Sequence, residues 1–196
     1  MEFLRTDSFP TPIWETDLKD IDLNSIKQYI ENMKSLSFTS SQVSNRGGWQ
    51  SITSNKIPPE ASFEHLYEVI QLAINSCADN IELDISLELQ NYWFNINEFG
   101  NYNVLHNHRG GILSGVFYID SENEQSGKIR FHRDDDINYF LPKLTKYNLV
   151  TASSIDYTPI KGKLIIFPSW LKHSVETNSS QCKRISMSFN YGIKKQ

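Results

Sequence analysis

The sequence of 196 residues contains little cysteine, and this scarcity excludes two classes of small protein. Its two cysteines, Cys77 and Cys182, are too few for a disulfide framework or for a zinc cluster built on cysteine. A reducing compartment fits this usage better. Met1 to Trp14 lacks the apolar centre of a signal peptide, and no later run approaches the roughly 18 apolar residues of a membrane span. We therefore expect a soluble, cytoplasmic protein with no membrane partner.

Basic charge is also scarce. The formal net charge is −4, with 19 Lys and Arg against 23 Asp and Glu. Such a chain has no positive field with which to neutralise a nucleic-acid backbone, so nucleic acid is not an expected partner. Hydrophobic residues make up 39% of the sequence and aromatic residues 12%, which is typical of a folded chain rather than a disordered one.

Two helices are predicted in the amino-terminal part, after an extended, proline-containing arm at 9–14. The first has Asp22 or Asn24 as its cap and apolar residues at helical spacing, namely Leu23, Ile26, Tyr29, Ile30 and Met33. A broad apolar stripe predicts the second helix over about 62–79. Between them, the polar and glycine-rich stretch 37–55 indicates irregular structure or a short strand pair.

Strand patterns dominate from Glu82 onward, with alternating or short apolar runs at 85–97, 111–119, 127–132, 164–167 and 184–191. Helices followed by many strands favour a mainly β (α+β) fold, a double-stranded β-helix or jelly roll with two supporting amino-terminal helices. We expect a single domain over 1–196. Its arm and helices would occupy 1–81, and its jelly-roll core would occupy 82–196.

The sharpest local pattern is His106-Asn107-His108. Residues two apart on a strand project to the same face and can hold one metal ion together. An isolated pair of this kind is also compatible with two structural loop residues. His173, after the apolar run 164–167 and Pro168, is a candidate third ligand from a second strand. The remaining candidates, His65 and His132, are expected to be surface or structural residues.

The last predicted strand has one polar and one apolar face. Its polar face carries Arg184, Ser186, Ser188 and Asn190, and its apolar face carries Ile185, Met187, Phe189 and Tyr191. The polar face can point to solvent or into a pocket. In a pocket, Arg184 could make a bidentate contact with a carboxylate, assisted by the serines.

Several longer motifs accompany these residues, and together they extend over about two thirds of the chain. They are 44–51, 93–97, 102–108, 114–118, 167–173 and 184–190. On these motifs the chain resembles the Fe(II)/2-oxoglutarate oxygenases with a double-stranded β-helix core, in particular a small branch near the prolyl hydroxylases.

This resemblance implies a role for several residues. His106 matches the first metal ligand and His173 the distal histidine, while Arg184 and Ser186 match the Arg-x-Ser element that holds the distal carboxylate of 2-oxoglutarate. Tyr118 resembles the tyrosine that assists this carboxylate, and Asn95 is implied to contact the co-substrate or the substrate. The implied reaction consumes O2 and 2-oxoglutarate at Fe(II), hydroxylates a C–H bond, and releases succinate and CO2.

His108 departs from the family pattern, because the family usually has Asp or Glu at this position. We expect His108 itself to be a ligand, which leaves the iron more positive. The alternatives are a two-histidine iron with an open position, or a carboxylate recruited from elsewhere, such as Asp134, Asp135 or Asp136.

Two other interpretations remain open. A cupin-type metal-binding dioxygenase would use the histidines without 2-oxoglutarate, but it does not require the Arg184-x-Ser186 element. A catalytically inactive binding domain would retain the barrel fold but would have lost the chemistry. The sequence leaves the substrate open, whether a peptide side chain, an amino acid or another metabolite, and it is compatible with a homodimer.

Overall fold

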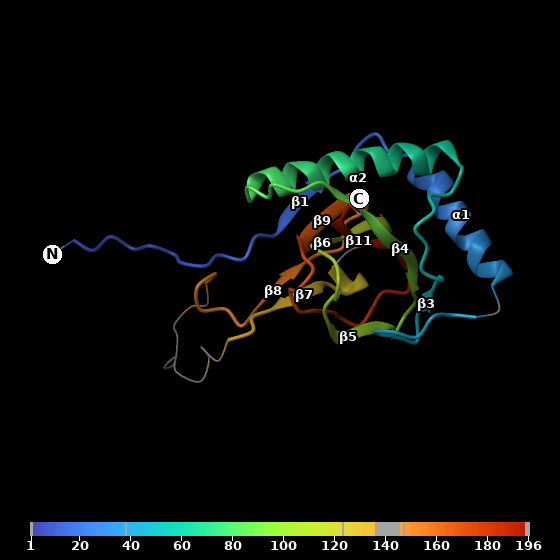
Figure 1. Ribbon diagram of the computed structural model, residues 1–196. Helices are drawn as coiled ribbons and strands as arrows, with labels where there is room; N and C mark the ends of the chain where they lie inside the picture. Colours follow the sequence, from blue (N-terminus) through green and yellow to red (C-terminus); the bar gives the residue numbers. More distant parts are fainter. Residues whose placement is uncertain (1, 38, 123, 136–145, 147, 195–196) are drawn as a thin grey trace.

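The computed structural model describes residues 2–37, 39–122, 124–135, 146 and 148–194. Two antiparallel sheets and two helices make up the fold (Figure 1). The six-stranded sheet has the order β1 (Trp14–Asp17), β9 (Lys163–Pro168), β6 (Leu113–Asp120), β11 (Arg184–Ile193), β4 (Leu87–Asn97) and β3 (Trp49–Gln50). The five-stranded sheet has the order β2 (Asn45–Arg46), β5 (Tyr102–His106), β10 (His173–Val175), β7 (Ile129–His132) and β8 (Ser154–Tyr157). This architecture confirms the predicted double-stranded β-helix fold.

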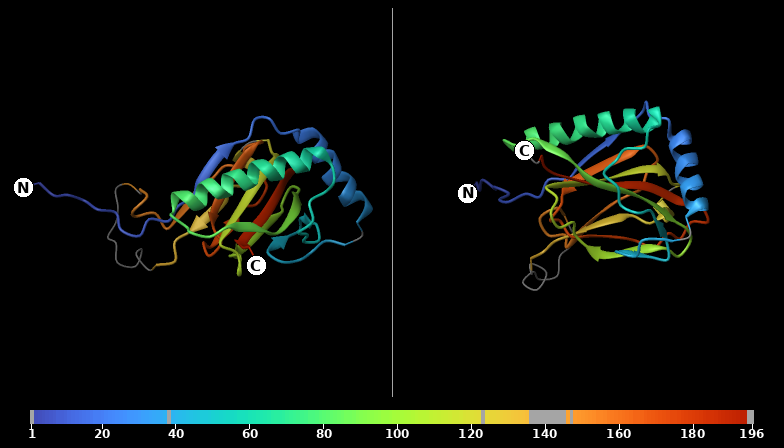
Figure 2. Two further views of the ribbon diagram at one scale, coloured as in Figure 1. Left: turned by 45° about the horizontal axis from the view of Figure 1, so that its top comes forward. Right: turned by 45° about the vertical axis from the view of Figure 1, so that its right-hand side comes forward.

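The helices are α1 (Leu23–Leu36) and α2 (Ala61–Asn80), and a short 3-10 helix spans Glu124–Ser126. Asp22 rather than Asn24 caps α1, because its Oδ1 accepts a hydrogen bond from the backbone N–H of Ser25 at 3.0 Å. Figure 2 shows α2 lying across one face of the six-stranded sheet, with α1 beside the end of that sheet. Neither helix is both long and apolar enough to cross a membrane, among the residues described.

The helices and the six-stranded sheet share one hydrophobic core. Ile26 and Ile30 of α1 are fully buried, and α2 contributes Phe63, Leu66, Ile70 and Ile74 to the same cluster. The apolar face of β11 packs against these helices through Ile185, Met187, Phe189 and Tyr191. Its polar face therefore points the other way, into the space between the two sheets. The alternation predicted the two faces, and the structure decides for the pocket over the solvent.

All five predicted strands are present, but the sequence reading missed several others. β1, β8 and β10 are only three or four residues long, too short for a period of two to stand out. β5, the strand on which the paired histidines were expected, ends at His106. The segment 37–55, predicted to be irregular or a short strand pair, contains two short strands that are not paired with each other. β2 pairs with β5 and β3 pairs with β4, so these neighbours in the chain lie in different sheets.

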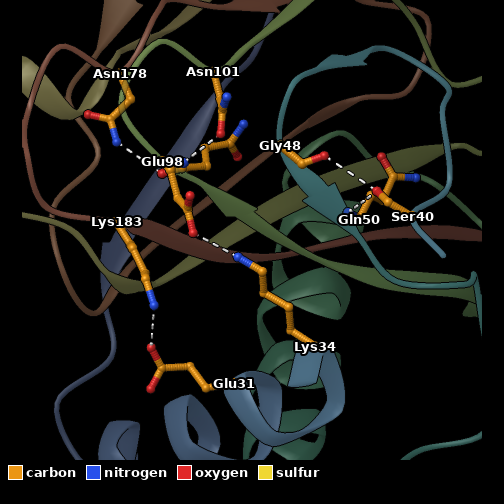
Figure 3. Close-up of polar contacts among 10 residues, drawn as sticks. Glu31, Lys34, Ser40, Gly48, Gln50, Glu98, Asn101, Asn178 and Lys183 are labelled. Atoms are coloured by element: carbon orange, nitrogen blue, oxygen red, sulfur yellow. Dashed lines mark hydrogen bonds and ion pairs between the residues drawn. The ribbon is translucent and has the colours of Figure 1, made fainter. Parts of the chain in front are cut away.

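Polar contacts fasten α1 to the rim of the sheets (Figure 3). The Nζ of Lys34 lies 2.7 Å from Oε1 of Glu98, just after β4, and the Nζ of Lys183, just before β11, lies 3.3 Å from Oε1 of Glu31. Asn178 reinforces the same rim by donating from Nδ2 to the backbone oxygen of Asn97 at 2.9 Å. These contacts hold together the ends of the two strands that carry Asn97 and Arg184.

Candidate metal centre and adjoining pocket

The fold brings three histidines from separate parts of the chain to one place. His106 ends β5 and His173 begins β10, and the two are direct partners in the antiparallel ladder. His108 lies two residues beyond β5 in a loop, not on the strand as expected, and its backbone N–H donates to the oxygen of Ser169 at 2.9 Å. One ligand atom from each ring lies within 4.8 Å of the others, so the three are placed to bind a metal ion.

Hydrogen bonds orient all three rings in the same way. Nδ1 of His106 lies 2.8 Å from the backbone oxygen of Val104, and Nδ1 of His173 lies 2.9 Å from that of Leu171. Nδ1 of His108 lies 2.6 Å from Oδ1 of Asn190. Since these oxygens can only accept, each Nδ1 carries the proton and each Nε2 keeps a free lone pair. This is the tautomer that a metal-binding imidazole needs.

Burial keeps the three rings neutral. It lowers the pKa of His108 to about 4, with a further contribution from the neighbouring His106. It also lowers the pKa of His106 and takes that of His173 well below the ordinary histidine value. Protons therefore compete weakly for the ligand nitrogens near neutral pH.

Carboxylates are absent from the cluster within the described ranges. Asp134 forms an ion pair with Lys172 at 2.5 Å, and Asp135 forms one with Arg133 at 2.6 Å. Asp136 lies outside the described residues.

The two histidines that were expected to be surface or structural residues are not part of the cluster. His65 is exposed on α2, and Nε2 of His132 bonds to Oγ of Ser174 at 2.8 Å.

A cavity that opens to solvent lies between the sheets beside the histidines. It is lined by every residue that the sequence singled out for a site: His106, His108, His173, Arg184, Ser186, Tyr118 and Asn95. Other lining residues include Ser44, Trp93, Asn97, Asn103, Phe167 and Ser188. Apart from Arg184, the lining side chains carry no formal charge at neutral pH.

Arg184 is a buried cation without a counter-charge in the described part of the chain. Its side chain is only 2% exposed, and its Nη1 donates to the backbone oxygens of Ser126 and Gly127, the second at 2.8 Å. Burial lowers its pKa to about 10, which leaves it protonated at neutral pH. Buried charges are normally paired. A cation that lines a cavity unpaired is suited to an anionic ligand, in particular a carboxylate.

Gly127 makes room for this guanidinium. Its φ of +83° is in the left-handed region, and an added Cβ would lie 2.5 Å from Nη1 of Arg184 and closer still to the backbone oxygen of Glu176. A side chain at this position would therefore displace the guanidinium or the backbone opposite it.

Three further polar residues form one row across neighbouring strands. Ser186 of β11 lies opposite Tyr118 of β6 on one side and Asn95 of β4 on the other. Burial raises the pKa of Tyr118 to about 12, so its phenol stays neutral and can donate a hydrogen bond. Asn95 donates from Nδ2 to Oγ of Ser188 at 3.2 Å, while its buried Oδ1 has no hydrogen-bond partner among the described residues. The row thus offers both donors and an acceptor to a ligand.

The sequence reading missed the polar residues behind His108. Asn190 was placed only on the polar face of its strand, and Asn91 was not considered at all. The alternation along β4 could have placed Asn91 on the same face as Asn95. Two sets of residues alternate there, Asn91, Trp93, Asn95 and Asn97 on one face and Tyr92, Phe94 and Ile96 on the other.

Residues 91–190, more than half of the chain, match the model of a protein family described as "Putative 2OG-Fe(II) oxygenase". This segment contains the three histidines, Arg184, Ser186, Tyr118 and Asn95. No curated protein matches the sequence.

Solved structures share the fold at low sequence identity. A prolyl-4-hydroxylase from Pseudomonas putida has a TM-score of 0.70 and 13% identity, and the match covers 94% of each chain. HygX from Streptomyces hygroscopicus, solved with nickel and 2-oxoglutarate, has a TM-score of 0.58 and 11% identity, over 94% of this chain and 84% of HygX. A Trichoplax adhaerens prolyl hydroxylase, solved with a peptide of hypoxia-inducible factor, has a TM-score of 0.59 and 13% identity, over 92% and 83% of the two chains.

Proposed function

This chain belongs to the 2OG-Fe(II) oxygenase family, and from that membership we propose that it is a dioxygenase that hydroxylates a C–H bond of a peptide or small molecule. One observation carries the proposal. Three histidines that present Nε2 line the same cavity as a buried arginine that has no acidic partner among the described residues. The histidines fit an Fe(II) ion, and the arginine fits the carboxylate of an acid bound beside it.

In this proposal, Nε2 atoms of His106, His108 and His173 hold Fe(II). Bound iron and 2-oxoglutarate supply the oxidising chemistry, in which O2 is consumed, 2-oxoglutarate is decarboxylated to succinate and CO2, and a hydroxyl group is formed on the substrate. Arg184 binds the distal carboxylate of 2-oxoglutarate and neutralises its charge. Ser186 and Tyr118 donate hydrogen bonds to that carboxylate, and Asn95 contacts the co-substrate or the substrate.

The three-histidine set distinguishes this proposed site from the usual one. A carboxylate ligand would cancel one positive charge of the metal, whereas a third neutral imidazole cancels none. We expect the redox potential and the O2 reactivity of the iron to differ accordingly. The ion pairs of Asp134 and Asp135 support His108 as the ligand over an acid recruited from either position.

Aromatic rings pack beside two of the histidines. The ring of Trp93 lies 5.4 Å from that of His108, and the ring of Phe167 lies 4.8 Å from that of His173, measured between centroids. Such rings lower the polarity around the ligands, which strengthens the electrostatic contacts made inside the site.

The uncharged remainder of the cavity lining supports a substrate whose reacting part is neutral. A peptide is one such substrate, and the Trichoplax prolyl hydroxylase of the same fold was solved with a peptide bound. A small metabolite with a neutral reacting carbon fits the same lining.

The decisive experiment is anaerobic titration with Fe(II), with 2-oxoglutarate, and with both. We expect a weak visible charge-transfer band only when both are present. Metal binding that does not respond to saturating 2-oxoglutarate would instead support the cupin-type alternative, and binding of neither would support an inactive domain. An untargeted search for oxidised products would then identify the substrate, with release of succinate as the sign of turnover.

A further inference from the structure

His108 differs from the other two histidines in what orients its ring. Nδ1 of His106 and Nδ1 of His173 each bond to the backbone oxygen two residues earlier, Val104 and Leu171. The backbone of their own strand therefore sets their tautomer. Nδ1 of His108 instead contacts side chains of the six-stranded sheet, with Oδ1 of Asn190 in β11 at 2.6 Å and Oγ of Ser114 in β6 at the longer distance of 3.1 Å.

Asn190 belongs to a polar cluster packed behind His108. Its Oδ1 also accepts a hydrogen bond from Oγ of Ser114 at 2.7 Å, and Ser114 in turn contacts Oγ of Ser169 at 2.7 Å. The Nδ2 of Asn190 donates to Oδ1 of Asn91 at 2.8 Å. The amide of Asn190 thus has a partner for its oxygen and for its nitrogen, which holds it in one orientation against the imidazole.

The orientation of this amide, which makes the shorter of the two contacts at Nδ1, favours one tautomer of His108. With its oxygen toward Nδ1, the proton stays on Nδ1 and Nε2 presents a lone pair. With its nitrogen toward Nδ1, the amide would donate there, the proton would move to Nε2, and His108 would be lost as an Nε2 ligand. A backbone carbonyl cannot make this exchange, so His106 and His173 are not subject to it.

We propose that Asn190 is a positioning residue that makes His108 a metal ligand, with Asn91 and Ser114 holding its amide in the required orientation. This inference rests on the proposed function, because it assigns a role within the same iron site. It also accounts for how a histidine at the usual carboxylate position obtains a fixed ring and tautomer.

The test compares two substitutions at Asn190. Asn190→Leu has a similar size but offers no acceptor, and partners of this kind typically contribute about 10–100-fold to metal affinity. We expect a loss of that size in anaerobic Fe(II) titrations of Asn190→Leu. Asn190→Asp keeps the acceptor and adds negative charge, so we expect it to bind Fe(II) at least as tightly as the wild type.

A second measurement reads the tautomer directly. The 15N shifts of His108 in the metal-free protein should report a proton on Nδ1 in the wild type and in Asn190→Asp, and a shift toward Nε2 in Asn190→Leu. A purely structural role of Asn190 would change the melting temperature without this change of tautomer. In a His108→Ala background, Asn190→Leu should produce no further loss of metal affinity.

The outcomes separate this inference from the proposed function. Wild-type Fe(II) affinity and an unchanged His108 tautomer in Asn190→Leu would overturn the role of Asn190 and leave the oxygenase proposal intact. A wild-type protein that binds no Fe(II) would overturn the oxygenase proposal, while the tautomer measurement still decides the role of Asn190. If Asn190→Leu fails to fold, Asn190→Asp alone decides, and weaker metal binding in that variant would overturn the inference.

Discussion

His106 and His173 face each other as direct partners across the antiparallel ladder of β5 and β10, with ring centroids 4.3 Å apart. The same backbone hydrogen bonds that pair these strands therefore bring two candidate ligands together. The strand pairing therefore positions both side chains before any ligand binds.

His173→Ala should abolish tight metal binding, because it removes one of three ligands and leaves two. The side chain is only 3% exposed, so we also expect the small cavity left behind to destabilise the fold by about 1–3 kcal/mol. Anaerobic Fe(II) titration and denaturant unfolding measure the two effects. His65→Ala is the control, since His65 is exposed on α2 and should leave both values unchanged.

His108→Asp tests the unusual ligand. It restores the two-histidine, one-carboxylate set of the wider family, so we expect this variant to bind Fe(II), whereas His108→Ala should bind it at least about 10-fold more weakly. The charge-transfer band of the Fe(II) and 2-oxoglutarate complex should also change energy in His108→Asp. Parental iron affinity in His108→Ala would rule out His108 as a ligand.

Arg184→Ala should weaken 2-oxoglutarate binding and spare Fe(II) binding. A hydrogen bond to a charged group contributes about 1.5–3 kcal/mol, which corresponds to a loss of about 10–100-fold in affinity. Titration of the Fe(II)-loaded protein with 2-oxoglutarate measures this loss. Unchanged 2-oxoglutarate affinity would reject the assignment of Arg184 as the carboxylate anchor.

Gly127→Ala should disturb the same anchor indirectly. The added Cβ would lie 2.5 Å from Nη1 of Arg184 at a φ of +83°, so we expect a loss of about 1–3 kcal/mol in the free energy of unfolding and weaker 2-oxoglutarate binding. Gly100→Ala is a matched control. Gly100 has the same φ of +83° but no atom within 4 Å of the added Cβ, so that variant should show the backbone strain without the loss of 2-oxoglutarate affinity.

The ion pair of Glu98 predicts a pH dependence of stability. The hydrogen bond from Lys34, together with its charge, lowers the pKa of Glu98 below its ordinary value of 4.5. A lowered pKa in the folded state stabilises the protein above the unfolded value, and this stabilisation is lost as the pH falls through the folded value. Because the side chain of Glu98 is 53% exposed, we expect less than about 1 kcal/mol.

Denaturant unfolding of the wild type and Glu98→Gln at neutral pH and at about pH 3 measures this contribution. The stability difference between the two proteins should vanish at the acidic pH. It should also shrink at high salt, because an exposed ion pair is screened. A difference that stays constant with pH would show that the charge of Glu98 contributes nothing.

The sequence alone determined the features that depend on residues close together in the chain. The helical spacing of Ile26 and Ile30 predicted α1, and the strict alternation from Arg184 to Tyr191 predicted the polar and the apolar face of β11. These patterns are readable because a helix or strand repeats within a few residues, and burial of one face imposes that repeat on the sequence.

Tertiary structure decided the features that depend on pairing between distant segments. The sequence did not predict that β10, only three residues long, pairs with β5 and so sets His173 against His106. Nor did it predict that Arg184 is buried without a counter-charge among the described residues, or that Asn190, 82 residues away, lies against Nδ1 of His108. Such contacts are made by backbone ladders and by side chains from opposite sheets, and no local repeat encodes which partner a polar side chain will meet.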